Sequence, residues 1–192
     1  MLENWYSHDV IVPGVVRIWE RHLLPAHRSN TWLILGKNWN LLIDPGRDIG
    51  DLPGFVGPWL RCPLTAVATN CHTETAGGLN RFPDSAIHLY DADELSTVPK
   101  RLLHDGHIFD LGNRQLEVIH VAGPSAGAIV LYEAERKELF TGGLLYAPLE
   151  QRQEGLQRIA GLTVDTVFPG KRNHFGRQRL RSIIAAGNAE TA

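Results

Sequence analysis

The segment "TNCHTETAGG", residues 69–78, concentrates side chains that can do chemistry. It places His72 and Glu74 two positions apart, after an apolar run at 64–68 and before a double glycine. Imidazole and carboxylate groups are ligands for divalent metals and also partners in general acid/base catalysis. The segment therefore indicates either a metal loop or an acid/base site at the end of a strand.

His72 is open to three interpretations: a vestigial metal ligand, a general base, or a hydrogen-bonded histidine at a strand end. Its neighbour Cys71 is interpreted as an inert thiol and not as a nucleophile, because adjacent side chains of an extended strand point to opposite faces. Cys62 and Cys71 are the two cysteines of the chain. A core of this size does not need a disulfide, so both are expected to be reduced.

The surrounding pattern predicts short strands and helices in alternation. Strands are expected at 9–20 with a break at 13–14, and at 31–36, 39–43, 64–69, 86–90, 115–123, 127–135, 138–146 and 164–170, with one more inside 98–112. Helices are expected at 51–61, from 76 onward, and at 91–95, 149–162 and 176–187. Because helices follow single strands, α/β layers are favoured over a bundle or an all-β sandwich.

The composition is that of one globular domain, expected over residues 1–192. Apolar residues make up 43% and charged residues 21%, and the net charge of −2 gives no strong field for nucleic acid or a membrane surface. The N-terminus lacks a basic and apolar leader, and no apolar run approaches the roughly 20 residues of a membrane span. We therefore expect a cytoplasmic protein.

Five motifs in this order resemble the metallo-β-lactamase superfamily, which includes glyoxalase II-like hydrolases. They are "NTWLI…LLIDPG", "TNCHTETAGG", "VIHVAGPSAGAIVLY", "LFTGGLLY" and "VDTVFPGK", and the resemblance covers about residues 10–185. It implies an α/β (α+β) fold, a four-layer αββα sandwich of two mixed β-sheets flanked by helices. It also implies a site along one edge of the two sheets.

The resemblance implies seven ligand positions for a pair of zinc or iron ions that generate hydroxide. In this chain those positions hold Asn70, His72, Glu74, Thr75, Pro124, Gly143 and Lys171. One of the seven keeps the family's residue, His72, and Glu74 keeps a carboxylate. A hydroxide-generating metal normally needs three protein ligands, and the charge of Lys171 would repel a cation. We therefore expect no family-type metal pair and no other cofactor.

The basic replacement at the last position predicts a new contact: the Lys171 ammonium pairs with Glu74 and takes the electrostatic place of a metal. The alternative is that Lys171 points to solvent. Lys171 also opens the basic segment 171–181, which is interpreted either as a phosphate or nucleic-acid patch or, in better agreement with the overall charge, as the solvated face of a helix.

The other histidines have mostly structural interpretations. His120 is expected to be structural, and His88, between apolar neighbours, to be half-buried packing. An alternative is a shifted metal site that combines His72 with the histidines at three further positions, His104, His107 and His174.

These residues favour a non-catalytic binding or interaction protein with a degenerate site, so the expectation leans against an enzyme. One alternative is a hydrolase of an ester or thioester-like small molecule that uses His72 and Glu74 in a rebuilt mononuclear or metal-free site. A second alternative is a scaffold or an oligomeric subunit. The expected partner is an unknown small molecule, a protein or a second copy of the chain, and neither nucleic acid nor a membrane is expected.

Overall fold

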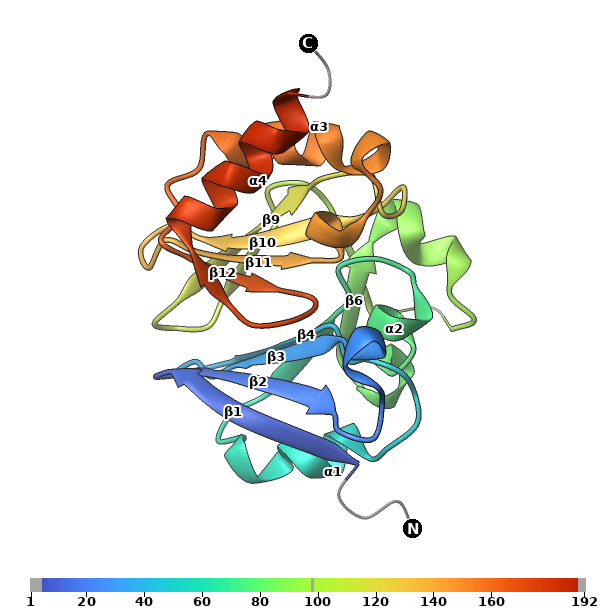
Figure 1. Ribbon diagram of the computed structural model, residues 1–192. Helices are drawn as coiled ribbons and strands as arrows, with labels where there is room; N and C mark the ends of the chain where they lie inside the picture. Colours follow the sequence, from blue (N-terminus) through green and yellow to red (C-terminus); the bar gives the residue numbers. More distant parts are fainter. Residues whose placement is uncertain (1–4, 98, 190–192) are drawn as a thin grey trace.

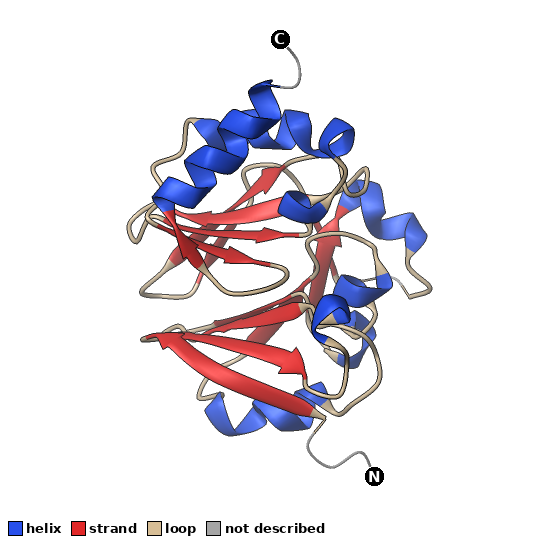
Figure 2. Ribbon diagram, in the orientation of Figure 1, coloured by secondary structure: helices blue, strands red, loops and turns tan. Residues whose placement is uncertain are grey.

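The computed structural model describes residues 5–97 and 99–189. Two β-sheets pack face to face, and helices cover their outer faces (Figure 1, Figure 2). This arrangement confirms the expected four-layer αββα sandwich of two mixed sheets flanked by helices. No helix in the described ranges is both long enough and apolar enough to cross a bilayer.

The first sheet has seven strands in chain order. They are β1 (Tyr6–Val12), β2 (Val15–Glu20), β3 (Asn30–Ile34), β4 (Asn40–Ile43), β5 (Leu64–Val67), β6 (Ser85–His88) and β7 (Arg101–Leu103). Pairing is antiparallel from β1 to β4 and parallel from β4 to β7. Because β4 and β5 run parallel, the segments that follow their carboxyl ends lie side by side.

The second sheet has six strands, in the order β13-β12-β11-β10-β9-β8. They are β8 (Ile108–Asp110), β9 (Gln115–His120), β10 (Ile129–Glu133), β11 (Glu138–Gly142), β12 (Thr166–Pro169) and β13 (Phe175–Gly176). Only β11 and β12 pair in parallel among these strands. The loops after β11 and β12 therefore also share one edge.

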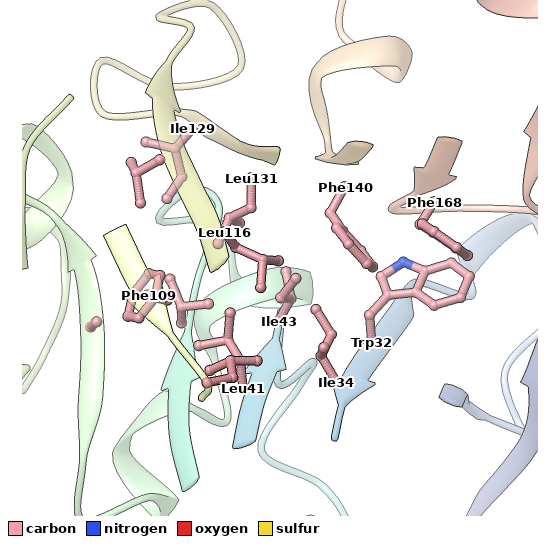
Figure 3. Close-up of a cluster of buried hydrophobic side chains, with 14 of the residues drawn as sticks. Trp32, Ile34, Leu41, Ile43, Phe109, Leu116, Ile129, Leu131, Phe140 and Phe168 are labelled. Carbon is pink, nitrogen blue, oxygen red and sulfur yellow. The ribbon is translucent and has the colours of Figure 1, made fainter. Parts of the chain in front are cut away.

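The core between the sheets is centred on three large aromatic side chains. Trp32 of β3 faces Phe140 of β11 and Phe168 of β12, with ring centroids 6.2 and 5.0 Å from its own (Figure 3). All three are almost fully buried. Since aromatic burial contributes most of a core's stabilisation per residue, this cluster fixes the sheets against each other at the end that carries the site.

The helices that cover the second sheet are longer than those that cover the first. The second sheet is covered by two long helices, α3 (Leu149–Ala160) and α4 (Arg177–Ala189), whose buried residues include Leu156, Ile159 and Leu180. The first sheet has shorter cover from α1 (Leu52–Val56), which begins after Asp51 where its carboxylate accepts a hydrogen bond from the Gly54 N–H. The turn at 13–14 and the hairpin of β3 and β4 follow the sequence expectation.

Some element predictions are wrong. The strand expected at 138–146 ends at Gly142, and Leu144–Tyr146 forms a 3₁₀ turn, η5. The helix expected from residue 76 is a single turn, α2 (Thr73–Ala76), followed by a 3₁₀ turn, η3 (Leu79–Arg81). Gly77 and Gly78 separate the two turns, and two consecutive glycines disfavour a continuous helix. The segment 98–112 contains two strands, β7 and β8, where one was expected, although residue 98 itself lies outside the described ranges.

Candidate active site

The two sheets are joined where β5 ends. Both carboxylate oxygens of Asp44 accept hydrogen bonds from Thr69, one from its N–H at 2.7 Å and one from its hydroxyl at 3.0 Å. The Thr69 carbonyl in turn accepts from the Ile129 N–H of the second sheet at 2.9 Å. Gly142, with φ +47°, lies so close that a Cβ there would be 2.0 Å from the Thr69 hydroxyl oxygen. Only glycine permits this approach, which brings Asn70 beside Gly143.

Asn70 organises the loop that carries His72 and Glu74. The Asn70 side chain is buried, and its Oδ1 accepts hydrogen bonds from the His72 N–H at 3.0 Å and from the Thr75 hydroxyl at 2.6 Å. The Thr75 N–H donates back to the His72 carbonyl at 2.9 Å, which starts α2. The backbone of this loop is therefore fixed, while the side chain of His72 is exposed.

The opposite part of the site is the loop after β12, which is held from both sheets. The Gly170 carbonyl accepts from the Asn30 N–H at 2.7 Å, and the Arg172 carbonyl accepts from Asn30 Nδ2 at 2.6 Å. The Tyr146 hydroxyl donates to the carbonyl of Lys171 between them. The Lys171 side chain therefore starts from an anchored backbone.

One cavity of about 200 Å³ lies between these loops. Its wall includes all seven positions that the resemblance implies, namely Asn70, His72, Glu74, Thr75, Pro124, Gly143 and Lys171. The other lining residues are Ser29, Tyr146, Ala147, Pro148, Gln151 and Gly170. The structure thus brings together side chains from both sheets that are up to 142 positions apart, between Ser29 and Lys171.

The predicted contact between Lys171 and Glu74 is wrong. Both residues line the cavity, but the ion pairs formed within the described ranges do not include this one. Each charge is accessible to water, and a solvated pair gains too little to hold two flexible side chains in contact. Lys171 therefore presents its charge to the cavity without a carboxylate partner among the described residues.

The interpretation of His72 as a hydrogen-bonded strand-end residue is also wrong. Its main chain is hydrogen-bonded, but its ring makes no hydrogen bond to any residue in the described ranges. The ring is free because His72 lies at the first residue before α2, where the chain has already left the sheet. A free imidazole at a cavity wall is available to a bound molecule.

Three polar residues of the cavity were missed by sequence reasoning, Ser29, Tyr146 and Gln151. The hydroxyl oxygen of Ser29 is buried and has no partner among the described residues, so it is available to a ligand. Tyr146 lies in η5 (Leu144–Tyr146), and burial raises the pKa of its hydroxyl. No local pattern marks Ser29, whereas Tyr146 ends the motif "LFTGGLLY" and could have been found from it.

Among the remaining histidines, His88 and His120 lie away from the cavity and pack against each other. His88 is fully buried rather than half-buried, and its ring stacks on that of His120 with centroids 4.4 Å apart. Burial is the main cause that lowers the pKa of His88. The His120 Nε2 lies 2.8 Å from the Ala126 carbonyl. Within the described residues no group of three or more His, Cys, Asp or Glu side chains is placed to hold a metal ion. The described residues therefore do not form the shifted histidine site that was the alternative.

The residues of the cavity do not fit the metal pair that the fold implies. The Asn70 side-chain oxygen is already occupied by two hydrogen bonds, and neither Pro124 nor Gly143 has a side-chain donor atom. His72 and Glu74 are two candidate ligands where a hydroxide-generating metal normally has three, and Lys171 adds a positive charge. The side chains present therefore do not supply the ligands of that metal pair.

Cys62 and Cys71 are both free, and burial raises the pKa of the Cys71 thiol.

Comparison with known proteins gives relatives along nearly the whole chain. The chain is 30% identical to a protein from Gallus gallus named acyl-coenzyme A thioesterase MBLAC2, over an alignment of 241 residues. This alignment covers 95% of this chain and 86% of the relative. The human protein of the same name is 29% identical over 236 residues, and covers 92% and 85%. A hydroxyacylglutathione hydrolase of Aeromonas salmonicida (strain A449) is 31% identical over an alignment of 158 residues, and the match covers 76% of this chain and 61% of that one. No family model matches the chain.

The fold agrees with these relatives. A metallo-β-lactamase from Pontibacter korlensis superposes with a TM-score of 0.81 at 20% identity, over 95% of this chain and 99% of that one. The chain belongs to the metallo-β-lactamase superfamily. The alignment to the Gallus gallus relative is 241 residues long, whereas this chain has 192 residues. The relative therefore carries internal segments that this chain lacks.

The comparisons also correct the functional expectation. The sequence favoured a non-catalytic binding or interaction protein, yet relatives that match nearly the whole chain are named thioesterases, and a further one is named a hydrolase. These findings contradict the non-catalytic interpretation. They agree better with the alternative, a hydrolase of an ester or thioester-like small molecule.

Proposed function

We propose that the protein hydrolyses an acyl thioester in the cavity between the two sheets, and that it does so with protein side chains alone. The observation that carries the proposal is the meeting of an imidazole, a carboxylate and an ammonium, from His72, Glu74 and Lys171, on the wall of one cavity. Neither the imidazole nor the ammonium has a hydrogen-bond or ion-pair partner among the residues that the structure describes. The names of the near-full-length relatives support the bond class, a thioester.

The proposed chemistry follows from the three groups. The imidazole of His72 removes a proton from water as the water oxygen attacks the thioester carbonyl carbon. The carbonyl oxygen becomes an oxyanion, whose charge is stabilised by the Lys171 ammonium. The carbon–sulfur bond then breaks, and the leaving thiolate takes the proton from the imidazolium. The products are a carboxylic acid and a thiol, and Glu74 stabilises the transient positive charge on His72.

The cavity sets the size of what enters it. A volume of about 200 Å³ accommodates a short acyl group and the reacting carbonyl, while a larger carrier must remain outside. The buried hydroxyl of Ser29, which has no partner among the described residues, is placed to hydrogen-bond a polar group of the bound acyl thioester. A thiol is also a better leaving group than an alcohol, which suits a site without a metal.

Exchange of Lys171 for methionine tests this function. Met keeps the length and much of the volume of Lys but removes the charge that stabilises the oxyanion. We expect kcat for a short acyl thioester, measured by thiol release, to fall about tenfold, because the ammonium is partly solvated and acts below the strength of a fully buried group. Lys137→Met, on the exposed turn between β10 and β11 and outside the cavity lining, is the matched control and should keep the wild-type kcat. Equal rates for all three proteins would contradict the role of Lys171.

A further inference from the structure

The loop between β12 and β13 is held from the other sheet by Asn30 of β3. The buried side-chain amide of Asn30 donates to the Pro169 carbonyl at 2.8 Å and to the Arg172 carbonyl at 2.6 Å. Its main-chain N–H donates to the Gly170 carbonyl at 2.7 Å. One residue of the first sheet thus fixes three carbonyls around Lys171, although it is not among the residues that line the cavity.

The carbonyl of Lys171 itself is held from a third direction. The hydroxyl of Tyr146, on η5 after β11, donates to it. The carbonyls of four consecutive residues, 169–172, therefore all accept hydrogen bonds from outside the loop. Each bond contributes modestly by itself, but together they hold the main chain on both sides of Lys171.

The loop needs this support because of its conformation. Arg172 has φ +64°, a left-handed backbone that a non-glycine residue keeps only when its surroundings impose it. The strand that follows, β13, has two residues, and so short a pairing fixes a turn weakly. Relaxation of Arg172 to an ordinary backbone conformation would redirect the chain at Lys171 and carry its half-buried side chain off the cavity wall.

We infer that Asn30 is a positioning residue for the reaction, which acts through Lys171 without touching the substrate. The inference rests on the proposed hydrolysis, in which the Lys171 ammonium stabilises the oxyanion. A charge of this kind is most effective when its place is fixed before the oxyanion forms, because no reorganisation is then needed during the reaction. Asn30 supplies that fixed place from the opposite sheet.

Exchange of Asn30 for alanine removes both side-chain bonds and keeps the main-chain bond to Gly170. We expect kcat for a short acyl thioester to fall about fivefold at unchanged KM, which is less than the about tenfold fall expected when the ammonium itself is removed. In the Lys171→Met background the same exchange should change kcat by less than about twofold, because the group that Asn30 positions is already absent. Asn30→Ser, which keeps a hydroxyl in the buried position, is the milder variant if Asn30→Ala does not fold, and should show the same dependence on Lys171.

Asn40→Ala is the matched control. Asn40 is also buried in the first sheet, and its side chain also makes two hydrogen bonds to main-chain groups, but it lies outside the cavity lining. Its removal costs a comparable pair of buried bonds without reaching Lys171. This variant should keep the wild-type kcat.

Hydrogen exchange at Gly170 tests the anchor without any reaction. The Gly170 amide donates to the Gly142 carbonyl at 2.9 Å, so its exchange rate reports opening of the loop. Measured by NMR, it should exchange about tenfold faster in Asn30→Ala than in Asn40→Ala, the effect of roughly one hydrogen bond.

The two measurements separate failure of this inference from failure of the proposed function. Wild-type hydrolysis that Asn30→Ala leaves unchanged, or lowers equally with and without Lys171, would overturn the positioning role and leave the function intact. Equal Gly170 exchange in Asn30→Ala and Asn40→Ala would also overturn it. Faster exchange in Asn30→Ala alone, with no thioester hydrolysis by the wild type, would reject the function and sustain the anchoring of Lys171 by Asn30.

Discussion

Exchange of His72 for glutamine is expected to lower kcat for acyl thioester hydrolysis by about a hundredfold or more, the usual contribution of a positioned general base. Glutamine keeps a hydrogen-bonding side chain but cannot accept a proton from water. The exposed ring of His72 makes no hydrogen bond within the described ranges, and the main-chain bond of His72 to Asn70 Oδ1 remains in the variant. The loss is therefore expected in kcat, with an unchanged thermal unfolding midpoint.

The matched control for this variant is His104→Gln, which changes another exposed histidine away from the cavity. Thiol release in the steady state measures both proteins, and the unfolding midpoint of each shows that the fold is kept. If His72→Gln retains a kcat within about threefold of wild type, His72 is not the base, and Glu74→Gln becomes the variant that must show the loss.

The second large effect is a fall in stability as pH rises, which has its cause in Asp44. Its carboxyl is fully buried, and loss of hydration raises its pKa to about 7, against the two hydrogen bonds from Thr69 that favour ionisation. In the unfolded chain an aspartic acid titrates near 3.9. The folded state therefore holds the proton more tightly, so this contribution to stability is complete below about pH 4 and is lost as pH rises through 7.

The expected size of this effect is roughly 2–3 kcal/mol in the free energy of unfolding between pH 5 and pH 8, at about 1.4 kcal/mol per pH unit. Asp44→Asn should remove that slope. Asparagine tolerates the φ of +55° at this position as aspartate does, so the backbone is kept. Chemical denaturation at several pH values measures the slope.

The control for Asp44→Asn is Asp93→Asn, which changes an exposed aspartate. Other groups that titrate in the same range are shared by all three proteins, so the difference between wild type and each variant isolates the single carboxyl. A slope that survives in Asp44→Asn, or disappears in Asp93→Asn, would show that another group causes it.

Much of the fold could be predicted because its signals are local. The apolar run of β5 and the turn at Pro13-Gly14 mark a strand and a break by residue type alone. The order of five motifs then predicted the sandwich, which the structure has. The start of α2 could not be predicted, because it depends on Thr75 bonding back to Asn70 and His72 after the chain has folded.

The candidate site could likewise be predicted only in part. The motif positions indicated which backbone segments meet, and the seven positions lie on one cavity wall. The conformations of exposed side chains could not be predicted from the sequence. For this reason the expected ion pair between Glu74 and Lys171 is not found among the described residues. Ser29 was missed because its place in the cavity arises only when β3 of one sheet packs against the loop after β12 of the other. The single-domain extent over 1–192 and the cytoplasmic location remain predictions.

We propose that this superfamily member breaks a thioester bond with His72 and Lys171 in place of a metal pair. The most direct measurement is thiol release by one protein sample before and after dialysis against a chelator, with the metal content of the same sample determined each time. We expect the same kcat in the metal-free sample and no gain when zinc or iron is returned. Activity that disappears with the metal and returns when zinc or iron is added would contradict it.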